Sequence, residues 1–157
     1  MDRSFIASLV PAAVEHRKKY KLFASVTIAQ AALESGWGKT VLARKANNLY
    51  GIKGIGPAGT IRMDTWEVVD GKDVSVQAGF KVYHCAEECL EDRARILTTL
   101  SRYRAVCWAE TPEQQCRAIL AGGWATDPAY ADKLIKIIDQ YDLQQYDVRS
   151  EPYPELP

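Results

Sequence analysis

Apolar residues recur with a helical period over most of the chain. From residue 3 to residue 20 they fall on one face of a helix, at Ile6, Leu9, Ala13 and Val14. Pro11 interrupts this stretch, so it must either kink the helix or mark a later start. A second helix is predicted for "VTIAQAALES", with Ser25 as its N-cap and Gly36 just after its end, and a short helix is expected from residue 39 to residue 44.

Between residues 61 and 83 the period changes to that of β-strands. β-Branched and aromatic residues stand on both sides of Asp70-Gly71, a dipeptide typical of the tight turn of a β-hairpin. The preceding stretch, "NNLYGIKGIGPAG", contains four glycines and a proline and therefore predicts a loop. We expect the hairpin to form a small lobe beside the helices, with the glycine-rich loop at 51–59 lining a cleft between them.

The helical period returns after the hairpin. A helix is predicted from residue 86 to residue 102, because its apolar residues share one face. Thr111-Pro112-Glu113-Gln114 forms a capping box with proline at the first helical position, and Asp127-Pro128 opens a last helix in the same way. The predicted fold class is therefore α+β and mostly α, a helical domain with a small β-hairpin lobe.

Length and composition fit one folded domain. The chain has 157 residues, of which 47% are hydrophobic and 25% charged, and we assign residues 1–147 to the domain and 148–157 to a proline-rich tail or linker. Twenty basic and twenty acidic side chains cancel, which gives no electrostatic support for nucleic acid as a partner. The start of the chain lacks the order of a secretory signal, and no apolar run approaches a membrane span, so membrane insertion is not expected.

The cysteines fit neither a dense disulfide framework nor a zinc pattern. Cys85 and Cys89 share the spacing of one helix face, but no second pair with ligand spacing completes a metal site. With Cys107 and Cys116, they are expected to be reduced thiols in packing positions. Neither a metal nor a cofactor is predicted.

Glu34 is the carboxylate that the helical pattern does not explain. It stands on the last turn of its predicted helix, where the negative end of the helix dipole disfavours the charged form. Apolar neighbours such as Trp37 would add desolvation, which raises the pKa of a carboxylic acid further. An acid with a raised pKa suits protonation of a leaving oxygen near neutral pH, although position alone favours a solvated charge at a helix end.

Five stretches in order resemble glycoside hydrolase family 73, the bacterial β-N-acetylglucosaminidases that cut peptidoglycan. They are "VTIAQAALESGWGKT", "NNLYGIKG", "TWEVVDGK", "FKVY" and "WATDPAYADKLIKIIDQYDL", and they extend from about Ala24 to Tyr146. The resemblance implies a lysozyme-like catalytic domain with its active site in the cleft. It also implies peptidoglycan glycan strands as the substrate.

The resemblance assigns catalytic roles to individual residues. The family's acid is the glutamate of "ALES", which is Glu34, and the second carboxylate often comes from the hairpin lobe, where "TWE" supplies Glu67. Asp64 is the alternative if the register of the lobe differs. The tyrosine of "TDPxY" is Tyr130, which could instead be a core residue.

Substrate contacts follow from the same motifs. Asn48 and Tyr50 match positions that shape the floor of the cleft, although Asn48 could serve turn geometry alone. The tryptophans could be core residues or could stack on sugar rings, and Glu67 could be a merely solvated acid on its strand. The full set of predicted substrate-binding residues is Trp37, Asn48, Tyr50, Trp66, Trp124 and Asp127.

The sequence departs from the family pattern at three positions. Trp124 stands where tyrosine is common, Lys81 where arginine is usual, and Cys85 where a serine often starts the next helix. None of these residues is the acid, so the departures affect substrate contacts and capping.

The implied function is hydrolysis of the β-1,4 bond between N-acetylglucosamine and N-acetylmuramic acid. A muramidase or lytic transglycosylase on the same fold, or a non-catalytic wall-binding module, is the alternative.

The implied setting is the cell wall, on the periplasmic or extracellular side. The absence of a signal peptide suits either a holin-released phage or prophage endolysin or a catalytic domain from a longer exported autolysin, and we expect a monomer. The sequence leaves open whether the reaction is inverting or substrate-assisted. Cross-link and acetylation preference are open as well.

Overall fold

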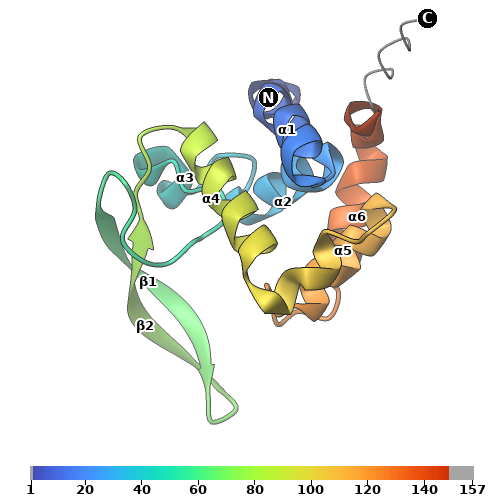
Figure 1. Cartoon of the computed structure of the whole chain (residues 1–157). Helices are drawn as coiled ribbons and strands as arrows, with labels where there is room; N and C mark the ends of the chain where they lie inside the picture. The colour runs from blue at the N-terminus through green and yellow to red at the C-terminus, as the bar shows by residue number, and fades with distance from the viewer. Residues whose placement is uncertain (1, 149–157) are drawn as a thin grey trace, which may run out of the picture.

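Helix α2 (Ala24–Ser35) lies at the centre of the helical body (Figure 1). The structure, a computed structural model, describes residues 2–148. Ten of the twelve residues of α2 are buried, and many of them are alanines, so the neighbouring helices can pack closely around it. These neighbours are α1 (Asp2–Tyr20), α5 (Pro112–Ala121), α6 (Tyr130–Gln140) and the 3₁₀ segment η2 (Leu143–Asp147).

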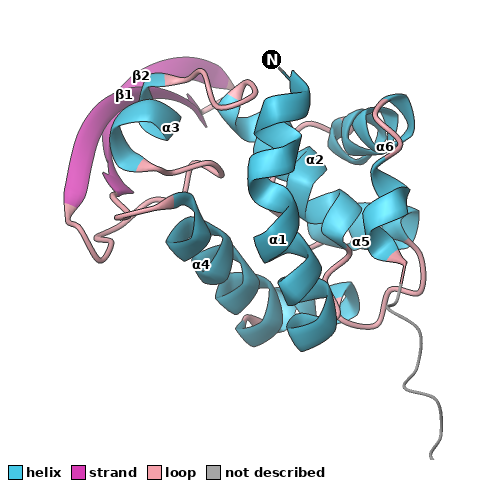
Figure 2. Cartoon of the chain, turned by 90° about the horizontal axis from the view of Figure 1, so that it is seen from above, coloured by secondary structure: helices cyan, strands magenta, loops and turns pink. Residues whose placement is uncertain are grey.

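The remaining elements connect this body to the lobe. Helix α4 (Ala86–Thr99) packs beside α1, as Figure 2 shows, and continues into the 3₁₀ segment η1 (Ser101–Val106). The short helix α3 (Val41–Ala46) lies between the body and the hairpin (Figure 2). The predicted fold class, mostly helical with one small sheet, is confirmed.

Strands β1 (Thr60–Val69) and β2 (Lys72–Lys81) form an antiparallel hairpin that projects away from the helices (Figure 1). The register pairs Val69 with Lys72, which leaves Asp70 and Gly71 as a two-residue turn. Both turn residues have positive φ, 50° and 76°, as a type I′ turn requires. The hairpin predicted from Asp70-Gly71 is confirmed.

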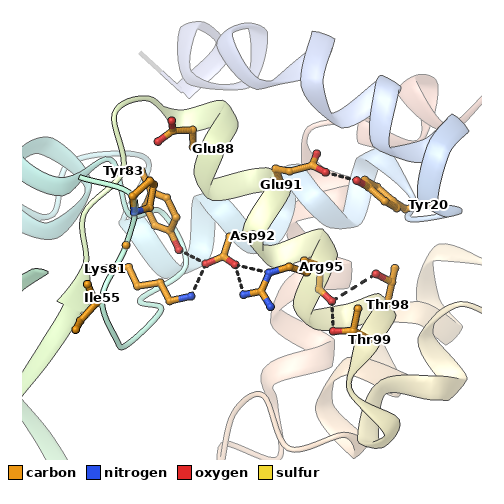
Figure 3. A pocket seen from close by; sticks show the side chains of 12 residues that line it. Tyr20, Ile55, Lys81, Tyr83, Glu88, Glu91, Asp92, Arg95, Thr98 and Thr99 are labelled. Atoms are coloured by element: carbon orange, nitrogen blue, oxygen red, sulfur yellow. Dashed lines mark hydrogen bonds and ion pairs between the residues drawn. The ribbon is translucent and has the colours of Figure 1, made fainter. Parts of the chain in front are cut away.

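Asp92 on α4 anchors the base of the hairpin. Its Oδ2 accepts hydrogen bonds from Lys81 Nζ at 2.9 Å and from the Tyr83 hydroxyl at 2.6 Å, and its Oδ1 accepts from Arg95 Nη2 at 2.6 Å. Figure 3 shows these contacts in a pocket of about 610 Å³ between the end of β2, α1 and α4. The three partners hold the pKa of Asp92 below its usual value, although its burial acts in the opposite direction.

Two helix starts differ from the predictions. Helix α2 begins at Ala24 with Phe23 as N-cap, so Ser25 is not the cap; its amide donates to Asp147 Oδ1 at 2.8 Å instead. Helix α6 begins at Tyr130, because Asp127 accepts the Ala129 amide in a turn that precedes the helix. Local sequence signals identified both helices but misplaced their first residues by two positions.

Other helix ends agree better with the sequence pattern. Helix α1 runs unbroken through Pro11, which lies on its exposed side, so a later start is excluded. Thr111 caps α5 by accepting the Gln114 amide at 3.2 Å, with Pro112 at the first position. The predicted helix at 86–102 ends at Thr99, and η1 follows it.

Most of the predicted tail, residues 149–157, lies outside the described residues. Within residues 2–148, no helix combines the length and apolar character that crossing a membrane would need.

Candidate active site

Glu34 emerges from the helix that is otherwise most deeply buried. Within α2 only Leu33 and Glu34 are partly exposed, and both lie on the last turn. The helix ends at Gly36, which adopts the left-handed conformation and donates its amide to the Ala32 carbonyl. The core side of α2 is therefore fixed by packing, and its last turn presents a carboxylate at the surface of the body.

The turn after Glu34 explains the "SGWG" sequence. Gly36, Trp37 and Gly38 have φ values of 54°, 61° and 78°, so three successive residues are left-handed. Glycine adopts this region without a steric penalty, whereas tryptophan does so only under constraint. Ser35 stabilises the turn, because its hydroxyl donates to the Ala31 carbonyl at 2.6 Å and accepts the Gly38 amide at 2.8 Å.

Tyr130 holds Glu34 from the neighbouring helix. Its hydroxyl donates to Glu34 Oε1 at 2.8 Å, across 96 positions of sequence. Burial raises the pKa of Glu34, and hydrogen bonds from Tyr130 and Trp124 lower it without cancelling the effect of burial. The balance leaves a carboxyl group that stays protonated at a higher pH than an exposed glutamate.

Two adjoining hollows on either side of Glu34 form the cleft. Their volumes are about 560 and 580 Å³, and both are lined by Glu34, Lys53, Thr65, Gly123 and Trp124. The first extends between Tyr50, Phe80, Leu100 and Tyr103, and the second between Trp66, Asp127, Tyr130 and Lys133. The cleft therefore lies between the helical body and the hairpin lobe, with the acid where the two hollows meet.

Three of the aromatic residues predicted to bind substrate line the cleft. Trp124 lines both hollows, and its ring packs against Tyr50 and Tyr103 at centroid distances of 6.4 and 6.0 Å. Tyr50 is buried apart from the surface that it gives to the cleft, and its hydroxyl donates to the Thr27 carbonyl. Trp66 is 72% exposed on β1, so its ring is available for stacking on a ligand.

Trp37 does not lie in the cleft. Its ring packs edge-on against Phe5 at a centroid distance of 5.9 Å and at a tilt against Tyr141 at 4.7 Å, and it lines neither hollow. The prediction that Trp37 binds substrate therefore has no support from its position. It helps instead to hold the left-handed turn that ends α2, since its neighbours come from α1 and from the end of α6.

Asn48 is a structural residue of the loop rather than part of the cleft surface. It is buried, its Nδ2 donates to the carbonyls of Ile52 and Lys81, and its Oδ1 accepts the Ile52 amide. The position is sterically closed to a ligand, so the predicted substrate contact is replaced by turn geometry. The glycine-rich loop also divides: Gly51 lines the cleft, whereas Ile55 and Gly56 line the pocket around Asp92.

Glu67 and Asp64 occupy opposite faces of β1, because successive side chains alternate. Glu67 shares its face with Thr65, which lines both hollows, and its Oε1 pairs with Lys53 Nζ at 2.6 Å. Asp64 accepts instead from Gln77 Nε2 on the paired strand, at 2.7 Å. Glu67 is thus linked to the cleft through Lys53, a residue that the sequence interpretation did not single out.

Asp127 lies at the edge of the second hollow. Its Oδ1 accepts the Ala129 amide at 2.9 Å, and its Oδ2 pairs with Lys133. These contacts, with the Lys133 interaction as the larger effect, lower the pKa of Asp127. The residue shapes the turn that delivers Tyr130 to Glu34 and keeps a charged pair at the rim.

The sequence pattern contained a signal for two further polar residues that were missed. Gln30 is fully buried in the apolar helix α2, and Arg93 is fully buried among the apolar residues that α4 turns toward the core. Both stand at positions where the helical period places apolar side chains. A polar residue on the core face is informative because its burial is costly without partners.

The thiols and carboxylates form no metal site in the described part of the chain. No cluster of three or more histidine, cysteine, aspartate or glutamate residues is positioned there to hold a cation. The four cysteines are free: Cys89 and Cys116 are buried, Cys107 is partly buried, and Cys85 is exposed. Cys85 precedes α4 as its N-cap and points away from the core, so it does not share a packing face with Cys89.

A helical body, a two-stranded lobe and a half-buried glutamate in the cleft between them define a lysozyme-like domain. The model of the glucosaminidase family, described as mannosyl-glycoprotein endo-beta-N-acetylglucosaminidase, matches residues 10–143. The chain belongs to this family.

Relatives and solved structures agree with this assignment. The chain is 40% identical to exo-glucosaminidase LytG of Bacillus subtilis, over 91% of this chain and 52% of LytG, and 39% identical to an autolysin of Enterococcus faecalis, over 93% and 21%. It therefore spans about half or less of these relatives. The catalytic domain of the autolysin Auto from Listeria monocytogenes superposes with a TM-score of 0.84 at 39% identity, covering 93% of this chain and 87% of that domain.

Proposed function

We propose that this domain hydrolyses the β-1,4 bond between N-acetylglucosamine and N-acetylmuramic acid in bacterial peptidoglycan, with Glu34 as the general acid. The observation that carries the proposal is the environment of Glu34, a half-buried carboxyl group at the meeting point of the two hollows, with Tyr130 bonded to one oxygen. Burial raises its pKa, which favours the protonated form that transfer to the glycosidic oxygen requires. The transition state of such a reaction resembles an oxocarbenium ion.

Glu67 is the second carboxylate in this proposal. It shares the face of β1 that carries Thr65, and Lys53 connects it to the cleft. There it orients or deprotonates the attacking water, or stabilises the acetamide of the substrate as that group attacks. Asp64 is the weaker candidate, because its side chain bonds to Gln77 on the paired strand, whereas Glu67 bonds to Lys53, which lines the cleft. An inverting pair would stand about 6.5–9.5 Å apart, and a double-displacement pair about 5 Å.

The cleft fits a linear glycan with a hydrophobic face on each sugar. Trp124 and Tyr50 give apolar surface beside the acid, and Trp66 gives an exposed ring on the lobe. Lys53, Asp127 and Lys133 give polar groups at the rim. A few aromatic faces with polar groups between them suit sugar rings, since each ring presents both C–H and hydroxyl surfaces.

Glu34→Gln tests the catalytic assignment. Glutamine keeps the size of the side chain and can still accept the Tyr130 hydroxyl, but it cannot transfer a proton. We expect turnover of purified wall to fall by at least about 100-fold, with the near- and far-UV circular dichroism of the folded protein retained. Near-normal turnover by this variant would remove Glu34 as the acid.

Analysis of the new reducing ends tests the bond assignment. N-acetylglucosamine at the new reducing ends is the expected product of wall digestion. N-acetylmuramic acid there would identify a muramidase, and the relatives include proteins of Lactococcus lactis named probable N-acetylmuramidase. The 1,6-anhydro form would identify a lytic transglycosylase, and binding to insoluble wall without release of any fragment would identify a wall-binding module.

The cell wall is the proposed place of action, and the domain acts there as a monomer in lysis or remodelling. Relatives named autolysin and peptidoglycan hydrolase FlgJ support this setting. The endolysin role stays a prediction, and a neighbouring holin gene would support it.

A further inference from the structure

Among the described residues, 2–148, Arg93 is the largest fully buried side chain, yet it has no carboxylate partner there. No ion pair in residues 2–148 includes it. Its Nε donates to Gln30 Oε1 at 2.6 Å, its Nη1 donates to Thr27 Oγ1 at 3.0 Å, and its Nη2 has no hydrogen-bond partner within the described chain. A buried guanidinium held by neutral groups is costly, which points to a role beyond stability.

A continuous series of hydrogen bonds leads from Arg93 to Glu34. After the Arg93–Gln30 contact, Gln30 Nε2 lies 3.0 Å from the Tyr130 hydroxyl, and that hydroxyl lies 2.8 Å from Glu34 Oε1. Arg93 and Gln30 are fully buried and line neither hollow of the cleft. The series therefore reaches the acid from inside the core and makes no contact with a ligand.

The chemistry of the donors sets the direction of every bond in this series. A guanidinium has only donors, so Gln30 must turn its carbonyl oxygen toward Arg93 and its amide NH₂ toward Tyr130. The Tyr130 oxygen then accepts from Gln30, and the single hydroxyl proton is left for Glu34. Glu34 Oε1 is occupied as an acceptor, so the acidic proton belongs on Oε2.

We propose that Arg93 is a positioning residue for the acid: through Gln30 it sets the direction of the Tyr130 hydrogen bond and so places the transferable proton of Glu34 on Oε2. The inference rests on the proposed role of Glu34. It extends that role to two core residues that touch neither the substrate nor the reacting atoms.

Other charged or titratable groups also face Glu34 across the cleft. Those that line the two hollows are Tyr50, Lys53, Arg102, Tyr103, Asp127, Tyr130 and Lys133. Lys53 pairs with Glu67, and Lys133 pairs with Asp127, so these two cations are partly neutralised by their own partners. Among these groups Tyr130 forms a direct hydrogen bond to Glu34. Trp124 also hydrogen-bonds to Glu34 but lies outside the series that starts at Arg93, so Tyr130 is the group through which the core can act.

Gln30→Glu reverses the direction of the hydrogen bond between residue 30 and Tyr130 and keeps a side chain of similar size. A carboxylate at this position accepts from Arg93 and from Tyr130 alike, so the Tyr130 hydroxyl turns away from Glu34. Protonated Glu34 can then donate its proton to the Tyr130 oxygen in a hydrogen bond. That proton is no longer directed at the substrate. We expect kcat to fall by about 10- to 100-fold with KM unchanged, because proton transfer is lost while the surface of the cleft is intact.

A double-mutant cycle separates this mechanism from a charge effect. In a Tyr130→Phe background the hydroxyl is absent, so Gln30→Glu should change neither kcat nor the alkaline limb of the pH profile further. Tyr130→Phe and Gln30→Glu alone should each move that limb to higher pH, because each removes a donor to the ionised form of Glu34. An equal effect of Gln30→Glu in both backgrounds would overturn the proposal.

Arg93→Gln and Thr27→Val test whether Arg93 sets the orientation of the Gln30 side chain. A glutamine at position 93 can donate or accept, so the orientation of Gln30 is no longer enforced, and we expect kcat to fall by about tenfold. Thr27→Val is the matched control, since it removes the other hydrogen bond of Arg93 and leaves the series intact. An equal loss of kcat in Thr27→Val would assign the effect to packing and overturn the proposal.

Failure of this inference differs from failure of the proposed function. An inactive Glu34→Gln combined with wild-type kcat in Gln30→Glu would reject only the role of the core series. An active Glu34→Gln would reject the acid itself.

Discussion

At the scale of single residues, Glu34 shows how burial and hydrogen bonding oppose each other at one carboxyl group. Burial at the last turn of α2 disfavours the ionised form of Glu34 and raises its pKa. Hydrogen bonds from Tyr130 and Trp124 favour the ionised form and offset part of this effect. Its folded-state pKa therefore lies above the value in the unfolded chain. The group contributes stability that is fully present below its unfolded pKa and is lost as the pH rises through the folded pKa.

Glu34→Gln should therefore increase the free energy of unfolding at neutral pH while it abolishes turnover. Glutamine carries no charge to bury, and its carbonyl oxygen can accept the Tyr130 hydroxyl in place of Oε1. Urea unfolding at pH 7 and at pH 3.5 measures the effect, and the gain should be confined to the higher pH.

Glu15→Gln is the matched control for that measurement. Glu15 is exposed on α1, and no ion pair to it occurs in residues 2–148. A surface substitution of this kind should alter stability by less than about 0.5 kcal/mol at both pH values. An equal gain in the two variants would refute the explanation from burial.

At the scale of elements, the end of α2 depends on a left-handed turn. Gly36 has a φ of 54°, and a Cβ added there would make an ordinary van der Waals contact with Thr40 Cγ2 at 3.7 Å. The cost of a side chain there is conformational rather than steric. Gly36→Ala should lower the free energy of unfolding by about 1–2 kcal/mol, as the left-handed conformation costs alanine.

Gly36→Asn should lose less stability than Gly36→Ala, since asparagine tolerates the left-handed region. Denaturant unfolding of both variants measures the difference. Equal losses would mean that the turn is limited by packing and not by its backbone conformation.

The attachment of the hairpin is a second property of elements. Phe80 and Lys81 are neighbours on β2 whose side chains alternate, so Phe80 faces the cleft and Lys81 faces Asp92 on the other side (Figure 3). Asp92 joins this strand to α4, and one carboxylate accepts from Lys81, Tyr83 and Arg95. The lobe that carries Glu67 is therefore attached to α4 by contacts on the side of β2 that faces away from the cleft.

Asp92→Asn should lower the free energy of unfolding by about 2 kcal/mol and speed amide exchange at the base of the hairpin. The depressed pKa of Asp92 means that its contribution is present above the unfolded value of about 3.9 and is lost as the pH falls through the folded pKa. The difference between variant and wild type should thus vanish in acid. Asp64→Asn, an exposed change on the same hairpin, is the control and should have little effect at either pH.

At the scale of the whole molecule, the cysteines report how far the core opens. Burial raises the pKa of Cys89 and of Cys116 to about 12, whereas Cys85 is exposed before α4. A thiol reagent should modify Cys85 quickly in the native protein and Cys107 more slowly. Cys89 and Cys116 should react only at the rate of global unfolding, because they lie in the core.

Mass spectrometry of the labelled protein measures those rates. Cys85→Ser should remove the fast reaction and leave the slow ones unchanged. Fast labelling of Cys116 in the native state would contradict this prediction and show that α5 opens locally.

Local sequence patterns predicted most of the fold because each pattern has a local cause. The two positive φ values of Asp70-Gly71 make a type I′ turn, and the Thr111 cap with Pro112 starts α5. Ser25 shows the limit of such reasoning. Its amide bonds to Asp147, 122 positions later, and a pairing of that range has no signature in the local sequence.

The sequence by itself determined the helical period, the hairpin and the unusual placement of Glu34 at the end of an apolar helix. Only the tertiary structure decided what surrounds that acid. Trp37 and Asn48, which the sequence placed in the cleft, lie outside it, and Tyr130 bonds to Glu34 from 96 positions away. The tertiary structure also placed Arg93 behind them in the core. The physical reason is that a carboxyl group acquires its pKa and the direction of its proton from burial and from donors on other elements, and packing alone brings those donors together.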